Sequence, residues 1–144
     1  MGAILRVRLP LRRSSANRLR VVLSAHLAAN GVPRAAAREV LLAADEAFNN
    51  AFMHSGDAGE AELRAEIAGL QVVVEIRDRG CGFDAGGFDA GSIPDPLMTH
   101  GRGLFLIHRL MDEVELRSSG AGAGTYVRMA KTFARPPRPA HLRG

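Results

Sequence analysis

One acidic residue lies at the end of an expected strand, where it could contact a ligand. Asp78 follows the alternating apolar run of residues 72–76, a pattern typical of a buried strand. Gly80 and Gly82 come next, and glycine lets the backbone approach a ligand that a Cβ would exclude. A carboxylate held there can accept a hydrogen bond from a donor such as an exocyclic amine. Because Asp and Gly are also common in ordinary turns, Asp-x-Gly-x-Gly alone does not establish a site.

A second polar pair lies on an expected helix over residues 34–54. Glu46 and Asn50 are spaced i, i+4, so their side chains are neighbours on the helix surface. They lie nearly opposite the apolar stripe, and polar residues in that position usually face water. Asparagine is a poor helix former, however, and Asn49 places a second one beside Asn50. This doubling indicates selection for something other than helix stability. The stripe consists of Leu41, Ala44, Phe48 and Phe52, with Ala51 beside it.

A third segment could hold phosphate. Residues 84–100 carry several glycines and two prolines and follow no regular period. A loop of this length in a compact domain is usually functional or disordered, and we interpret it as a mobile lid. A helix then opens at the run Gly101-Arg102-Gly103-Leu104. Glycine at a helix start exposes free backbone N–H groups, the physical basis of phosphate binding there. A Gly124-Thr125 pair begins the last expected strand and completes the set.

The composition fits one globular domain. A length of 144 residues suits a single hydrophobic core, and 47% hydrophobic with 24% charged residues is typical of a soluble chain. No apolar run approaches a membrane span, and residues 1–10 alternate like a strand instead of forming a secretory signal. The single cysteine, Cys81, excludes an internal disulfide and a Cys-rich zinc site. We therefore expect a cytoplasmic protein with no membrane partner.

The positive charge is concentrated near the N-terminus. The net charge is only +4, but residues 1–38 contain arginines and no acid. Such a surface suits either an acidic protein or a nucleic acid. Lys131 is the only lysine in the sequence, so an arginine excess caused by genomic base composition is an equally good explanation. The arginines are Arg6, Arg8, Arg12, Arg13, Arg18, Arg20, Arg34 and Arg38.

The remaining periodicities predict strands and one more helix. His26 lies on the apolar face of a helix that includes residues 19–27, and we expect it to pack in the core rather than bind a ligand. A turn at Ala68-Gly69 predicts a hairpin. We expect one domain over residues 1–133 and a disordered, basic, proline-rich tail over residues 134–144. The expected strands cover residues 4–9, 60–67, 71–77, 114–116 and 125–129.

In order and spacing, these segments resemble the ATP-binding domain of the GHKL superfamily, which includes gyrases and histidine kinases. The runs from Asp45 to His54 and from Gly101 to Ile107 look most like the anti-sigma-factor serine/threonine kinase branch. The resemblance spans residues 4–132. It implies an α/β two-layer sandwich, with a mixed, mostly antiparallel sheet and about three helices on one face. ATP would lie between the helices and the sheet.

The resemblance also implies roles for the helix pair. Asn50 would hold Mg²⁺ that bridges the phosphates of ATP, because an amide oxygen is a hard ligand suited to this ion. Asn50, rather than Asn49, fits the Glu-x-x-x-Asn spacing. Glu46 would be the general base that accepts the proton from a substrate serine hydroxyl, or from water, as its oxygen attacks the γ-phosphate.

Other roles implied by the resemblance concern the nucleotide itself. Asp78 would recognise the adenine amine, and Gly80 and Gly82 would let the backbone approach the base. Thr125 would support the adenine site from the sheet. The helix opening would hold the phosphates and consists of Gly101, Arg102, Gly103 and Leu104.

A protein of this branch is a bacterial regulator. The resemblance implies that the chain binds a sigma factor and phosphorylates a serine or threonine of a STAS-type antagonist, with residues 1–38 as a candidate docking surface. An alternative is a nucleotide-gated binding module without kinase activity. Homodimerisation through the first strand or helix is also implied. Direct nucleic-acid binding is disfavoured, because only 5% of the residues are aromatic and could stack on bases.

Overall fold

A computed structural model shows an α/β fold and describes residues 2–55, 59–78, 99–118 and 125–134. The strands and helices follow one another in the order β1–α1–α2–β2–β3–α3–β4–β5. The strands are β1 (Ala3–Pro10), β2 (Glu60–Ala68), β3 (Gln71–Asp78), β4 (Glu113–Ser118) and β5 (Thr125–Thr132). The helices are α1 (Ser15–Ala29), α2 (Arg34–Ser55) and α3 (Thr99–Leu110). Every predicted strand and helix is present, with ends shifted by a few residues.

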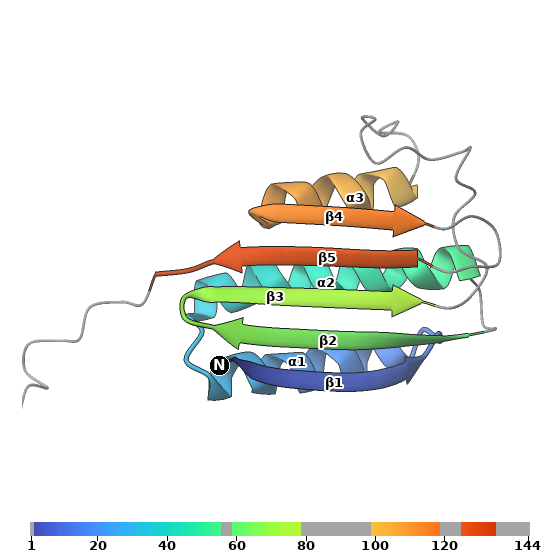
Figure 1. The fold of residues 1–144 in the computed structure, drawn as a ribbon. Coiled ribbons are helices and arrows are strands. Elements are labelled where there is room, and N and C mark those ends of the chain that lie inside the picture. The colour runs from blue at the N-terminus through green and yellow to red at the C-terminus, as the bar shows by residue number, and fades with distance from the viewer. Residues whose placement is uncertain (1, 56–58, 79–98, 119–124, 135–144) are drawn as a thin grey trace, which may run out of the picture.

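The five-stranded sheet has the order β1-β2-β3-β5-β4 and is covered by the helices on one face (Figure 1). All four described strand pairings are antiparallel, so the sheet is wholly antiparallel across the described strands rather than mixed. The two-layer sandwich predicted from the sequence is confirmed. Strands β1 and β4 form the two edges, and the hairpin of β2 and β3 lies inside the sheet.

The hairpin between β2 and β3 fixes the register of the central strands. Gly69 has φ of +61°, a backbone conformation that L side chains rarely adopt and that tight hairpins require. Ala68 pairs with Gln71 next to the turn, and the register continues to Ala61 opposite Asp78. Because the side-chain period of a strand is two, this register decides which residues face the helices.

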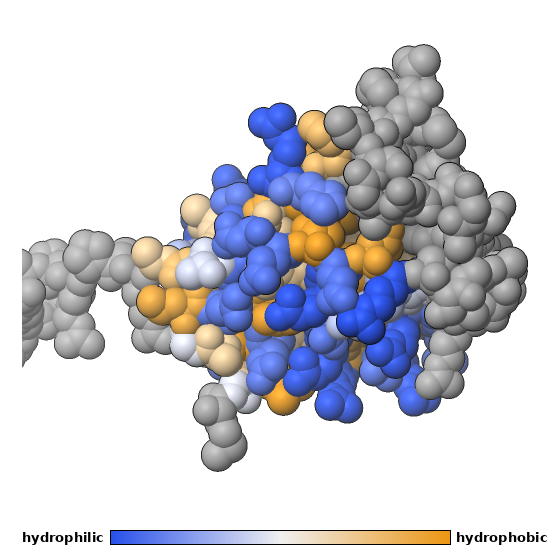
Figure 2. All heavy atoms as spheres, turned by 45° about the horizontal axis from the view of Figure 1, so that its top comes forward, coloured by the Kyte–Doolittle hydropathy of each residue, from blue (hydrophilic) through white to orange (hydrophobic). Residues whose placement is uncertain are grey.

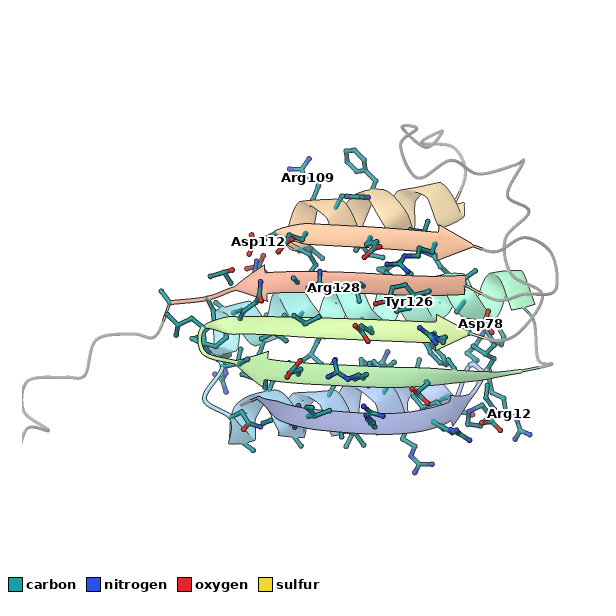
Figure 3. The ribbon with its side chains drawn as sticks, in the orientation of Figure 1. Arg12, Asp78, Arg109, Asp112, Tyr126 and Arg128 are labelled. Carbon is teal, nitrogen blue, oxygen red and sulfur yellow. The ribbon has the colours of Figure 1, made fainter. Side chains whose placement is uncertain are left out.

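The two faces of the sheet differ sharply in polarity. Every second residue of β2 and β3 is buried beneath the helices, and the residues between them lie on the uncovered face. That uncovered face carries both charges and the ring of Tyr126 (Figure 3). In a second view, hydrophilic side chains cover most of the described surface, with smaller hydrophobic patches between them (Figure 2). The buried side chains of β2 are Ala61, Leu63, Ala65 and Ile67.

Helix α2 is the central element of the helical layer. It packs against α1, α3, β3 and β5, and its buried surface is therefore wider than the stripe seen in the sequence. Small side chains make this packing possible, since alanine allows neighbouring helices to approach closely. Phe48, at 1% exposure, is the largest side chain that α2 buries. Its other buried apolar residues are Ala36, Val40, Ala43, Ala44, Ala47 and Ala51.

Two polar side chains tie the layers together. The His26 Nε2 lies 3.3 Å from the Ala3 carbonyl oxygen and so joins α1 to β1, which agrees with a packing role for this histidine. Lys131 of β5 donates to the Leu110 carbonyl oxygen at 2.8 Å and to Glu39 Oε2 at 3.1 Å. The lysine side chain is only 14% exposed, so one ammonium group links β5, α2 and the end of α3.

None of the helices in the described part of the chain is both long enough and apolar enough to cross a membrane. The domain limits at residues 1–133 stay a prediction, and most of the predicted tail, residues 135–144, lies outside the described residues.

Candidate functional site

Strand ends and helix ends meet at one end of the molecule. Asp78, the last residue of β3, lies directly opposite Thr125, the first residue of β5. The C-terminal half of α2 and the beginning of α3 lie at this same end (Figure 1). The fold therefore brings together three of the segments predicted to form a site, although they are far apart in the sequence.

Asp78 places a carboxylate on the covered face of the sheet. It continues the buried positions Val72, Val74 and Ile76 of β3, and it is 1% exposed. Thr125 is also buried, at 5% exposure. A buried carboxylate and hydroxyl on an otherwise apolar face must be hydrogen-bonded to be tolerated. This pair can accept a hydrogen bond from a ligand amine and donate one from the hydroxyl.

Asn50 is buried in α2, at 5% exposure, whereas Asn49 is exposed. The helix thus separates the two asparagines, and Asn50 is the one inside the protein. Its Nδ2 is buried without a hydrogen-bond partner among the described residues. An unpaired buried amide destabilises a fold unless another group completes its bonding. The simple expectation that residues opposite the apolar stripe face water is wrong for Asn50, because α2 is packed on several sides.

This amide fits the ion that the resemblance implies. A half-turn of the amide about its terminal torsion exchanges its nitrogen and oxygen, so the side chain can present a neutral oxygen to a cation. Mg²⁺ favours such oxygen ligands and takes few of them from a protein. Asn50 could therefore hold Mg²⁺, which when bound would neutralise phosphate charge.

Glu46 lies one helical turn before Asn50 and is half-buried. Burial raises the pKa of the Glu46 carboxyl above its ordinary value, and the negative charge of Asp45 raises it further. A carboxylate with a raised pKa is a stronger base than one in water, which suits proton abstraction. Asp45 itself is paired with Arg20 of α1, whose Nη1 lies 2.8 Å from the Asp45 Oδ1.

The remaining predicted residues are only partly covered by the structure. Gly80, Gly82 and the expected lid up to residue 98 lie outside the described residues. Helix α3 begins at Thr99, two residues before the predicted opening. Its first turn therefore includes Gly101 and Arg102, and Gly103 and Leu104 follow directly. Backbone N–H groups in a first turn have no partner within the helix, so this segment can offer donors to phosphate.

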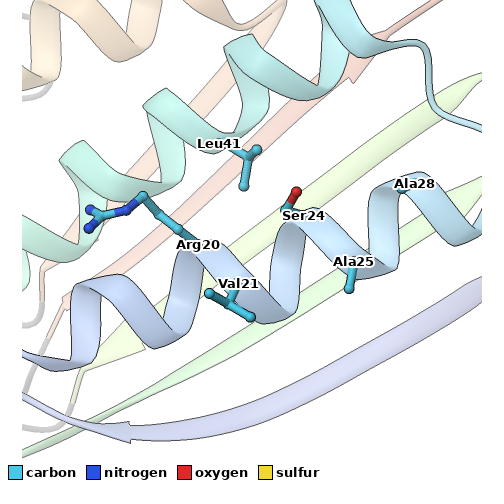
Figure 4. Close-up of a pocket in the computed structure, with 6 residues that line it drawn as sticks. All are labelled: Arg20, Val21, Ser24, Ala25, Ala28 and Leu41. Atoms are coloured by element: carbon cyan, nitrogen blue, oxygen red, sulfur yellow. The ribbon is translucent and has the colours of Figure 1, made fainter.

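A shallow groove between α1 and α2 is a second candidate surface (Figure 4). It has a volume of about 500 Å³. Val21, one of the residues that line it, is 61% exposed, and Arg20 reaches from α1 toward α2. The sequence gives no signal for this groove, because the groove forms only where α1 and α2 pack together. The Arg20–Asp45 pair that joins the two helices is 25 positions apart in the sequence. The lining residues are Arg20, Val21, Ser24, Ala25, Ala28 and Leu41.

Comparison with known proteins agrees with this fold. Residues 9–131 match the family described as the histidine kinase-like ATPase domain. The chain therefore belongs to this family, and the GHKL resemblance is confirmed. Among curated proteins it is similar to the serine-protein kinase RsbW of Bacillus pumilus strain SAFR-032, with 26% identity. That match covers 92% of this chain and 87% of the relative.

Solved structures share the architecture. The structure of the RsbU and RsbW domains of Rv1364c from Mycobacterium tuberculosis superimposes with a TM-score of 0.72 at 21% identity. The match covers 94% of this chain but only 34% of that larger one. A blue-light activated histidine kinase domain from Erythrobacter litoralis EL346 gives a TM-score of 0.55 at 18% identity, covering 85% and 61% of the two chains. At these identities the likeness concerns the fold.

Proposed function

We propose that this chain is an ATP-dependent serine/threonine protein kinase that acts as a cytoplasmic anti-sigma factor. Its substrate would be a STAS-type antagonist, and its second partner a sigma factor. The observation that carries the proposal is the buried, incompletely bonded amide of Asn50, one turn from the half-buried Glu46. Family membership supports ATP binding, and the similarity to an RsbW serine-protein kinase supports the reaction.

In this proposal each residue has a separate task. Asp78 and Thr125 would bind the adenine, and Asn50 would hold Mg²⁺, which when bound would neutralise phosphate charge. The first turn of α3 donates backbone N–H groups to phosphate oxygens. Glu46 accepts the proton of the substrate hydroxyl as that oxygen bonds to the γ-phosphorus. The bond from this phosphorus to the β,γ-bridging oxygen then breaks, and ADP leaves.

Phosphotransfer tests the proposal directly. The chain is incubated with γ-labelled ATP and purified STAS-domain proteins of the same organism. We expect label on one of them with wild type, and a rate about 10² to 10⁴ times lower with Glu46→Gln. Nucleotide binding that changes partner affinity, without any label transfer, would instead support the gated binding module. A chain that binds neither Mg-ATP nor any candidate partner would contradict both functions.

We restrict the proposed docking surface to part of residues 1–38. Arg6 and Arg8 lie on the uncovered sheet face, while Arg20 lies on α1 beside the groove. The N-terminal arginines thus do not form one surface. Arg12 lies at the end of the sheet where Asp78 is found (Figure 3). We assign docking to the α1 side, where exposed arginine and exposed apolar area adjoin.

A charge-reversal pair tests this assignment. Replacing Arg18 and Arg20 of α1 by Glu should weaken partner binding without weakening Mg-ATP binding. Replacing Arg6 and Arg8 by Glu makes the same change of net charge on the other face and should leave partner affinity nearly unchanged. Equal losses from both variants would indicate general electrostatic attraction. Homodimerisation through β1 or α1 stays a prediction, and the position of β1 at a sheet edge is compatible with the first of these.

A further inference from the structure

The α1–α2 groove contains an arginine that is already paired with an acidic residue of the protein. Arg20 is the only charged side chain among the groove's lining residues. Its guanidinium is bonded to Asp45 at 2.8 Å, with side-chain exposures of 46% for Arg20 and 20% for Asp45. An acidic partner that enters the groove thus meets an arginine whose charge is already neutralised from the other side.

Asp45 connects this groove to the proposed catalytic carboxylate. It is the residue before Glu46 on α2, and it accepts a hydrogen bond from Arg20 of α1. Arg20 can therefore pair with either of two acidic groups. One is Asp45, which precedes Glu46, and the other is a carboxylate of a partner that binds in the groove. Arginine carries several donors in a fixed fork, but its positive charge is single.

We propose that Asp45 is an internal competitor for Arg20, and that a carboxylate of the docked STAS-type antagonist takes Arg20 from Asp45 and leaves the Asp45 charge beside Glu46. The inference rests on the proposed function and adds a form of regulation to it. An acidic partner surface would release the negative charge of Asp45 next to Glu46, and a basic partner surface would not. The direction in which Asp45 raises the pKa of Glu46 agrees with a stronger base in the docked complex.

The competition predicts that removing a charge from the protein tightens the binding of the antagonist. Asp45→Asn removes the competing charge but keeps the shape of the side chain, so the antagonist should bind more tightly than to wild type. Exposed ion pairs are weak, and we expect its Kd to fall between about 1.5-fold and 5-fold. Arg20→Gln should weaken binding. The double variant should bind like Arg20→Gln alone, because Asp45 then has nothing to compete for.

A matched control separates competition from net charge. Glu62 pairs with Arg8 at 3.7 Å on the uncovered sheet face, so Glu62→Gln makes the same charge change far from the groove. Its antagonist Kd should equal that of wild type. Circular dichroism and thermal unfolding of each variant establish that the fold is kept.

Kinetics distinguish a regulatory pair from a structural one. In phosphotransfer to the antagonist, Asp45→Asn should lower KM and also lower kcat by a few fold, because Glu46 loses a neighbour that strengthens it as a base. An ion pair with only a structural role would raise KM or leave both constants unchanged. Arg20→Gln should raise KM without a loss of kcat.

The outcomes separate this inference from the function beneath it. Tighter binding by Asp45→Asn with unchanged Glu62→Gln supports the competition, even if wild type transfers no phosphate. Equal or weaker binding by Asp45→Asn overturns the competition and leaves the kinase proposal intact. Failure of wild type to bind any STAS-domain protein or sigma factor overturns the proposed function, and this inference with it.

Discussion

The covered and uncovered faces of the sheet hold their polar groups in opposite ways. On the uncovered face, Glu75 and Arg77 of β3 lie among neighbours of opposite charge, and Arg64 lies 3.9 Å from Glu75. On the covered face, the same strand buries three apolar residues and then Asp78. Exposed charges are solvated whether or not they pair, whereas a buried polar group must have a specific partner. Polar residues under the helices are therefore the more informative set.

Asp78→Asn tests the covered face with the largest expected effect. Mg-ATP at about 100 times its Kd should stabilise wild type by roughly 2.7 kcal/mol, a rise in Tm of several degrees. The amide can donate where the carboxylate accepts, so we expect the variant to lose most of this rise. Thermal shift with and without Mg-ATP is the measurement.

The neighbouring residue supplies the control for that experiment. Arg77 lies on the same strand but on the uncovered face, and its guanidinium stacks on Tyr126 at 5.2 Å from the ring centre. Arg77→Gln should keep the nucleotide-dependent rise in Tm. If both variants lose it, the effect comes from the strand as a whole and the contrast between the faces is wrong.

Asn50→Leu tests whether the buried amide is kept for a ligand. Leucine has a similar shape and no unpaired polar atom, so the protein without nucleotide should become more stable by about 1 kcal/mol. At the same time the Mg-dependent part of the ATP shift should vanish. Chemical unfolding measures the first effect and thermal shift the second. A variant less stable than wild type without nucleotide would mean that the amide is satisfied within the fold.

Glu46→Gln gives a smaller effect with a defined pH dependence. The pKa of Glu46 is raised in the folded state, so that state binds the proton more tightly than the unfolded chain does. The contribution to stability is fully present below the ordinary value of 4.5 and is lost as pH rises through the folded pKa. The neutral variant lacks this loss. Its Tm should exceed that of wild type by about one to a few degrees at pH 7 and match it near pH 4.

A reversed pH trend would contradict the burial of Glu46. If wild type gained stability relative to Glu46→Gln as pH rose, the carboxylate would be stabilised in its ionised form. Glu46 would then lie in a solvated or positively charged environment rather than a partly buried one beside Asp45.

Local patterns carry most of the fold in this sequence. The period-two runs and the turn at Gly69 predict β2 and β3 within one or two residues, because one buried face imposes that period. The wholly antiparallel pairing and the central place of α2 are not local properties. They depend on which elements pack together. The sequence predicts a single buried stripe on α2 because many of the alanines that the structure buries were not counted as buried.

The candidate site shows the same distinction between features local to one element and contacts between elements. The spacing of Glu46 and Asn50 and the strand-end position of Asp78 can be read from the chain, since each follows from one element. The Arg20–Asp45 pair joins α1 to α2, and Lys131 joins β5 to α2 and α3. Contacts between elements have no periodic signature. They appear only when the packing is known.

Arg8→Ala tests the uncovered face and should have the smallest effect. The Arg8 guanidinium lies 3.7 Å from Glu62, and the two side chains are 73% and 44% exposed. Water replaces such a pair almost completely, so the free energy of unfolding should change by no more than about 0.5 kcal/mol. The nucleotide-dependent rise in Tm should be unchanged. A loss well above 1 kcal/mol in urea unfolding would show that the charges of this face stabilise the sheet. The two faces would then differ in polarity but not in whether their polar groups need specific partners.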